Sequence, residues 1–238
     1  MSEKQPSDTR LAIKFLTADG RGPQSNFKWP QPGEWVETKG ELSACHNGVH
    51  AATLAQALTW CDSSAWLIEL DGEIIEADYK LCARRGRLVR RLDAWDERSA
   101  RLFAADCAER VLPIFERERP NDARPRKAIE AARAYARGEI HAAGLAAARV
   151  AAWAAAGDAW DAARDAASVA ARAAAWTAAR AAAWTAARAA AGLAVNAAGM
   201  DAASAAVEDA EREWQGQRLA ACLGLTSDEL DALGADRT

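Results

Sequence analysis

Hydrophobic and polar positions alternate in short runs along the first part of the chain, from Arg10 to Leu92. Runs of this length that are rich in β-branched and aromatic residues are typical of strands. The expected strands are 11–16 (LAIKFL), 34–38 (EWVET), 66–75 (WLIELDGEII) and 86–92 (GRLVRRL), separated by turn-rich pieces. The sequence therefore predicts a β-rich first half.

Two local signals refine this half. Asp71-Gly72 is a typical hairpin turn pair and predicts that residues 73–76 form a returning strand. Asn47-Gly48 predicts a turn, and Thr53 is placed to cap a short helix over residues 54–60, with His50 just ahead of the helix start.

Beyond Trp95 the apolar period changes from two to about 3.6, which indicates helices. The first is expected over 97–118, with Pro113 either kinking it or separating its last turns. A second begins near Pro125 and ends at Gly138. A last long helix is expected from Asp201 to Gly224, followed by a short helix capped by Thr226 or Ser227 that ends near residue 233.

Between these helices the chain carries four consecutive alanine-rich octads over residues 160–191. Each octad has arginine in its fifth place, but eight residues do not complete whole helical turns, so the arginines cannot form a stripe on one straight helix. We expect shorter helices folded together, with breaks near residues 157–158, 177 and 192. Tryptophans are expected to supply the large buried surfaces that alanine lacks, namely Trp153, Trp160, Trp176, Trp184 and Trp214.

These patterns predict an α+β chain, in which a small β-rich module precedes an alanine-rich all-α bundle. We place the β-rich module, with one or two short helices, at residues 1–95 and the bundle at 96–225. Residues 226–238 are expected to form a short helix and a tail. The change in composition near residue 98 favours two domains.

Composition limits the class of protein. The net charge of −4 and the pI near 5.5 provide no overall basic field, so nucleic acid or nucleotide is a possible but not a favoured ligand. The polar amino terminus lacks an apolar signal region, and no long apolar run of non-alanine residues follows, so we expect a cytoplasmic protein without membrane contact. Five cysteines spread over both halves indicate reduced thiols rather than a disulfide framework.

The stretch from residue 45 to 61 contains the residues most capable of chemistry. Cys45, His50 and Cys61 have a C-x4-H-x10-C spacing that could approach zinc, although no fourth ligand is evident. A second interpretation makes Cys45 a nucleophile with His50 as its base and Glu69 as a candidate carboxylate. The third, which we favour, makes His50 a structural residue and the cysteines core packing. No cofactor is predicted.

Five arginines crowd the segment from residue 84 to 91 and form the best local candidate for anion binding: Arg84, Arg85, Arg87, Arg90 and Arg91. Clustered guanidinium groups bind phosphates or carboxylates in bidentate fashion. In a strand, however, alternate side chains point to opposite faces, so the five cannot share one face. A solvated edge that discourages aggregation is the favoured interpretation.

Part of the first half resembles ADP-ribosyltransferases. The residues 48–52 (GVHAA), the small-residue helix 55–60 and the strand 66–70 are similar to the middle motif of that family, in which Gly-x-Tyr-x-Ala opens a helix. His50 stands where the family has the tyrosine that stacks on nicotinamide. The resemblance implies a nucleotide-binding or ADP-ribosyltransferase-like enzyme as an alternative function.

The chain as a whole resembles a family of actinobacterial and phage proteins, in the segments PGEWVE, CHNGVHAA, WLIELDGE, RRGRLVRRLDAWD and EREWQGQRLAACLGL. Residues 100–220 are similar to a helical immunity domain of polymorphic toxin systems, through residues 108–112, 120–125 and 134–138. This resemblance implies a non-enzymatic, immunity or antitoxin-like protein that binds another protein, a toxin or a host or phage factor. It assigns no catalytic residue, and the oligomeric state stays open.

Overall fold

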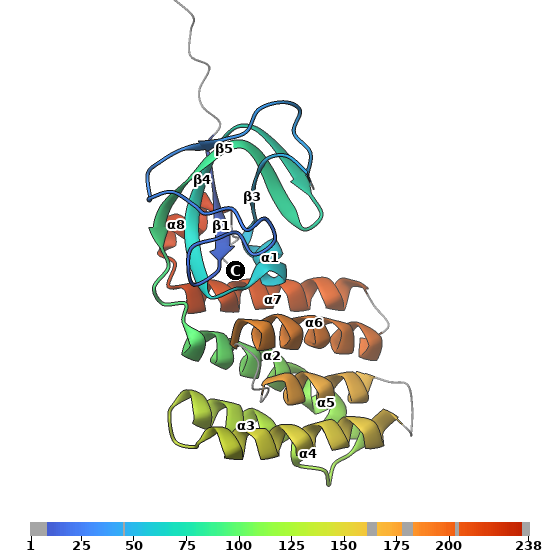
Figure 1. Cartoon of the computed structure of the whole chain (residues 1–238). Helices are drawn as coiled ribbons and strands as arrows, with labels where there is room; N and C mark the ends of the chain where they lie inside the picture. The colour runs from blue at the N-terminus through green and yellow to red at the C-terminus, as the bar shows by residue number, and fades with distance from the viewer. Residues whose placement is uncertain (1–8, 45, 161–165, 178–182, 203–204, 235–238) are drawn as a thin grey trace, which may run out of the picture. The chain divides into compact units, whose positions relative to one another are not determined.

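The computed structural model describes residues 9–44, 46–160, 166–177, 183–202 and 205–234 (Figure 1). The chain divides into two compact units. The first, called the β unit here, combines residues up to Trp95 with those from Leu219 onward. The second, called the helical unit, comprises Asp96–Arg218. Strands followed by helices make the protein α+β, as the sequence predicted.

The β unit is built on one antiparallel sheet. Its strands are β1 (Arg10–Leu16), β2 (Val36–Glu37), β3 (Val49–Ala51), β4 (Ser64–Ala77) and β5 (Lys80–Arg91). The strand order is β1-β4-β5-β2, and β3 also pairs with β5. Ile13 and Ala52 exchange backbone hydrogen bonds of 2.8 and 2.9 Å, so the residue after β3 also reaches β1. The sheet therefore curls into a small barrel-like ring (Figure 1).

The hairpin between β4 and β5 corrects one prediction. Asp71-Gly72 is not the turn, because β4 continues to Ala77 and pairs with Lys80 at the end of the hairpin. Instead, the pairing register shifts between Asp71 and Ile74, and Gly72 has φ +78° there. Glycine tolerates this left-handed conformation in a bulge as well as in a turn. The pair Asp71-Gly72 is therefore compatible with either a bulge or a hairpin turn.

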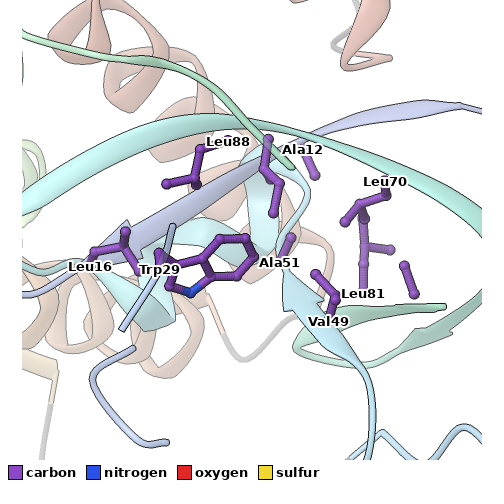
Figure 2. Packing of buried hydrophobic residues seen from close by; sticks show 10 residues of the cluster. Ala12, Leu16, Trp29, Val49, Ala51, Leu70, Leu81 and Leu88 are labelled. Atoms are coloured by element: carbon purple, nitrogen blue, oxygen red, sulfur yellow. The ribbon is translucent and has the colours of Figure 1, made fainter. Parts of the chain in front are cut away.

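The interior of the curled sheet holds a cluster of large apolar side chains (Figure 2): Ala12, Leu16, Trp29, Val49, Ala51, Ile68, Leu70, Leu81, Ala83 and Leu88. In β1, β3 and β4 they come from alternate positions, so one face of each of these strands is inward. Trp29 reaches this cluster from the loop after β1 (Figure 2). On the opposite face Phe15 meets Trp95 edge to face, with ring centroids 5.6 Å apart.

Three short helices belong to the β unit. The helix α1 (Leu54–Ala57) begins at Thr53, whose side chain accepts from the Gln56 backbone as predicted, and continues into the 3-10 turn η1 (Leu58–Trp60). The third, α8 (Ser227–Ala232), is capped by Thr226 and contacts β1. Glu229 of α8 forms two 2.7 Å hydrogen bonds with the guanidinium of Arg90. The carboxy-terminal segment thus packs with strands that are far away in sequence.

The helical unit contains α2 (Glu97–Glu118), α3 (Arg124–Ala136), α4 (Ala142–Trp160), α5 (Ala166–Thr177) and α6 (Ala183–Ala202). Most of α7 (Ala205–Leu223) follows in the same unit. The helix α2 contacts α3, α5 and α6, while α4 contacts α3 and α5 (Figure 1). The predicted bounds of α2 are confirmed, and it runs through Pro113 as a single helix.

The alanine array differs from its prediction in two respects. Helix α4 continues past Gly157 and α6 past Gly192, so neither glycine ends a helix; the break expected near Thr177 borders residues 178–182, which lie outside the described residues. The final helix does not begin at Asp201, which lies in α6. A single interior glycine costs only about 1 kcal/mol relative to alanine, and long alanine-rich flanks and packing offset it.

The prediction that tryptophans supply the large buried surfaces can be followed for two of the five. Trp153 and Trp214 are only half-buried, and the side chains of Trp160, Trp176 and Trp184 lie outside the described residues. The fully buried side chains of α5 and α6 are mainly alanines: Ala170, Ala171, Ala173, Ala174, Ala187, Ala190, Ala191, Ala194 and Ala197. The described helices of the array therefore pack alanine on alanine. No helix within these described ranges is long and apolar enough to cross a membrane.

Candidate functional site

His50, the centre of the sequence-based candidates, lies in β3 and pairs across the sheet with Cys82. Its Nε2 atom is buried and has no hydrogen-bond partner within the described residues. Burial lowers the pKa of His50 below its usual value, and the nearby charges of Lys80 and Lys14 lower it further, against hydrogen bonds to the backbone of Ala44 and Ser43. The imidazole is therefore held neutral at physiological pH.

Of the catalytic candidates in this region the structure describes His50 and Glu69, and it does not bring these two together. His50 pairs with Cys82 of β5, whereas Glu69 pairs with Arg87. These two positions of β5 are five residues apart, which corresponds to about 16 Å along a strand. Glu69 instead accepts a 2.7 Å hydrogen bond from Arg87. The carboxylate therefore cannot orient the imidazole.

The proposed metal ligands are also only partly placed. Cys45 lies outside the described residues. Cys61 is fully buried, and its thiol lies 3.7 Å from the backbone oxygen of Ala57. Across the described part of the chain, no group of three or more His, Cys, Asp or Glu side chains could hold a metal ion. Cys61 thus occupies the core position that the favoured interpretation gave it.

The arginine-rich strand β5 presents its guanidinium groups to carboxylates of the same unit. Arg84 pairs with Glu73, Arg85 with Asp71, Arg87 with Glu69, Arg90 with Glu229 and Arg91 with Asp93. As the strand alternation requires, these side chains do not form one patch. The acidic partners neutralise the segment, which weakens it as an anion site.

Among these arginines of β5, Arg85 and Arg87 both contact the ring of Trp35. Both guanidinium carbons lie 4.7 Å from the centroid of the Trp35 ring. The indole thus contacts two cations, whose charges are balanced by Asp71 and Glu69. Such cation–π contacts stabilise the short strand β2 against β5.

Lys14 is the charged residue that the sequence analysis did not single out. It lies on the inward face of β1 between Ala12 and Leu16, and its Nζ donates a 2.5 Å hydrogen bond to the His50 backbone oxygen. The same Nζ lies 4.9 Å from the centroid of the Trp29 ring. Burial lowers the pKa of Lys14 to about 8. The signal was present in the run LAIKFL, where lysine occupies an inward position of an alternating pattern.

The helical unit links its helices through partly buried ion pairs. Asp106 of α2 accepts 2.7 Å hydrogen bonds from Arg133 of α3 and Arg218 of α7. Arg110 of α2 bonds Glu211 of α7 at 2.5 Å. The hydrogen bonds from Glu109 and Asp106 raise the pKa of Arg133, so its charge is permanent. Such carboxylate–guanidinium pairs fix the register between α2 and its neighbours.

The solvent face of α4 is apolar. Its exposed residues, as far as Ala156, are Ala143, Gly144, Ala147, Val150 and Ala154, whose spacing follows one side of a helix. Val150 is 66% exposed, more than any other large apolar residue described in the helical unit. The opposite side of α4 buries Leu145 and Ala152 against α3.

Comparison with protein families identifies the helical region. Residues 90–222 match the family described as Imm-5 like putative immunity protein. This match covers more than half of the chain and includes the whole of α2 to α6. The chain belongs to this immunity protein family.

In this member of the Imm-5-like family, the strands of the β unit up to residue 89 precede the matched region, and residues from Leu219 onward complete the unit. Residues 10–100 match a domain of unknown function, DUF7666, which includes all five strands of the sheet. No curated protein and no solved structure matches the chain. The short helix α8 lies outside both matched regions.

Proposed function

We propose that this Imm-5-like protein acts by binding a toxin protein through its helical unit and thereby blocking it. The observation that supports this proposal is the family match over residues 90–222, which coincides with a unit that folds around its own core. The charged side chains that connect α2 to α3 and α7 form ion pairs with one another inside the unit. They support the unit rather than perform chemistry.

The apolar face of α4 is the surface that we assign to the toxin. Exposed contiguous apolar surface on a folded unit typically marks an interaction site. On α4 the exposed positions around Val150 are alanine or glycine, so its surroundings are apolar. The exposed Val207 of α7 has charged surroundings instead, because Glu208 and Asp209 follow it and both pair with Arg212. A partner that packs a helix or a loop on small side chains can approach the α4 backbone closely.

The test uses the full chain and the toxin protein encoded beside its gene, both purified. Binding is measured by isothermal titration calorimetry, and inhibition by the toxin's own activity. Val150→Glu places a charge in the middle of the α4 face, and we expect it to weaken binding by about 30-fold, since a central contact contributes about 2 kcal/mol.

Val207→Glu is the matched control, because it introduces the same charge at an exposed valine of another helix. We expect it to bind the toxin like the wild type. Equal binding by Val150→Glu and the wild type would reject the α4 face while leaving the function intact. A wild-type chain that neither binds nor inhibits the toxin would reject the proposed function.

A further inference from the structure

The β unit contains a cation, Lys14, that makes no ion pair with any residue that the structure describes there. The side chain of Lys14 is half-buried on the inward face of β1, opposite Trp66 in the register with β4. Its described contacts are the His50 backbone oxygen and the face of the Trp29 ring. An ammonium group has three donors, and this environment uses one of them in a hydrogen bond.

The carboxylates that could neutralise Lys14 are engaged by arginines. Along β4, the acidic side chains of Glu69, Asp71, Glu73 and Glu76 pair with Arg87, Arg85, Arg84 and Arg10. Among the residues that the structure describes, Lys14 makes no ion pair. A poorly solvated charge without a partner is unfavourable unless a ligand or another group compensates it.

A second lysine, Lys80, acts electrostatically on the same histidine as Lys14. Lys80, at the start of β5, places its Nζ 5.7 Å from the centroid of the Trp60 ring and likewise makes no ion pair within the described chain. Both lysines act electrostatically on His50, whose imidazole lies on the strand between theirs.

We propose that the β unit binds a small oxyanion, a carboxylate or a phosphate, at the ammonium group of Lys14. The anion accepts hydrogen bonds from the donors of Nζ that the protein leaves unused. Trp29 contributes the adjacent aromatic wall, and partial exposure of the Lys14 side chain gives a small solute access. This site lies in the β unit and does not depend on toxin binding.

The direct test follows the lysine side chains of the full chain by NMR, using protein labelled with ¹⁵N-lysine. Sodium phosphate and sodium acetate are titrated separately, with sodium chloride keeping the ionic strength constant. We expect the Lys14 signal to shift and saturate with at least one of the two anions. The signals of Lys39 and Lys127, which are exposed, should not saturate.

Thermal unfolding of variants provides the second measurement. The effective anion should raise the Tm of the wild type, because ligand binding stabilises the folded state. Lys14→Met and Lys14→Gln should abolish this rise, whereas Lys39→Met, the matched control at an exposed lysine, should keep it. The proposal is overturned if the Lys14 signal does not saturate with either anion, or if the Lys14 variants respond like the wild type.

Discussion

The β unit and the helical unit are stabilised by different kinds of packing. The β unit surrounds Trp29 with leucine, isoleucine and valine from four strands. In the helical unit, α5 and α6 bury mostly alanine, and ion pairs connect α2 to α3 and α7. In the β unit, large side chains supply the buried area. In the helical unit, small side chains let the helices approach closely, and ion pairs fix how the helices are aligned. Truncating a buried side chain should therefore destabilise the β unit more, whereas enlarging a buried side chain should destabilise the helical unit more.

The largest effect is expected from truncation in the β unit. Ile68 is fully buried in the cluster inside the sheet. Ile68→Ala should lower the free energy of unfolding of this unit by about 2–5 kcal/mol, since it removes apolar contacts and leaves a cavity. Hydrogen exchange measured by mass spectrometry should show faster exchange in β4 and β5. Unchanged protection there would contradict the assignment of this cluster as the core.

A second large effect concerns Lys14 and depends on pH. The pKa of Lys14 is lowered from 10.5 to about 8 in the folded state. The unfolded chain therefore binds more protons between these values, and stability should rise as pH increases from 8 to 10.5. The gain is at most about 3 kcal/mol.

Lys14→Met should remove this pH-dependent gain. Urea unfolding of the wild type and the variant at pH 7, 8.5 and 10 measures the difference. We expect the stability of the variant relative to the wild type to be greatest at pH 7 and to decline towards pH 10. A difference that does not vary with pH would contradict the shifted pKa.

Breaking an ion pair in the helical unit should have an intermediate effect. Glu211 is buried, binds Arg110 and accepts a 3.0 Å hydrogen bond from Gln215. Glu211→Gln keeps the shape but removes the charge, and we expect a loss of about 2 kcal/mol, typical of a hydrogen bond to a charged group. Chemical denaturation followed by circular dichroism measures it. Asp209→Asn, at an exposed pair on the same helix, is the control and should cost less than about 1 kcal/mol.

Overpacking tests the alanine core directly. Ala173 of α5 is fully buried. Ala173→Leu adds volume where helices are in close contact, and we expect it to destabilise the helical unit by about 1–3 kcal/mol. The exposed Ala147→Leu in α4 is the control and should leave the thermal midpoint nearly unchanged. If Ala173→Leu is as stable as the wild type, the packing of α5 is looser than described.

The smallest effect is expected for the contact of α8. Arg90 lowers the pKa of Glu229 from 4.5 to about 2 through their hydrogen bonds. The pair therefore contributes stability above pH 4.5 that is lost as pH falls towards 2. Because the Arg90 side chain is 40% exposed, we expect Glu229→Gln to cost less than about 1 kcal/mol at pH 7. Thermal unfolding at pH 7 and pH 3 measures the cost, which should shrink at the lower pH.

For the arginines of β5 and for Lys14, the sequence predicted the strand face of each side chain but not its ion-pair partner. Strand alternation predicted that the five arginines of β5 cannot share one face, since that rule depends on backbone geometry alone. It could not show that five carboxylates bind them, because one of these, Glu229, lies far away in sequence. Equally, the inward position of Lys14 was readable from the sequence, but its lack of a carboxylate partner depends on which strands are its neighbours.

The sequence by itself determined the elements whose signals are local. The 3.6-residue period and Asp96 define α2, Thr53 and Thr226 cap their helices, and Gly224 follows the end of α7. These features depend on backbone hydrogen bonds within a few residues. The resemblance to an immunity domain was likewise readable from the sequence, and the family match confirms it.

Only the tertiary structure decided the rest. Gly72 forms a bulge because β5 pairs along both parts of β4, and Gly157 and Gly192 lie inside α4 and α6 although glycine is a weak helix former. The segment from Leu219 onward groups with the β unit through contacts that no local pattern encodes. A residue's local preference is worth about 1 kcal/mol or less, whereas the burial of one large side chain is worth more, so packing selects among the locally allowed conformations.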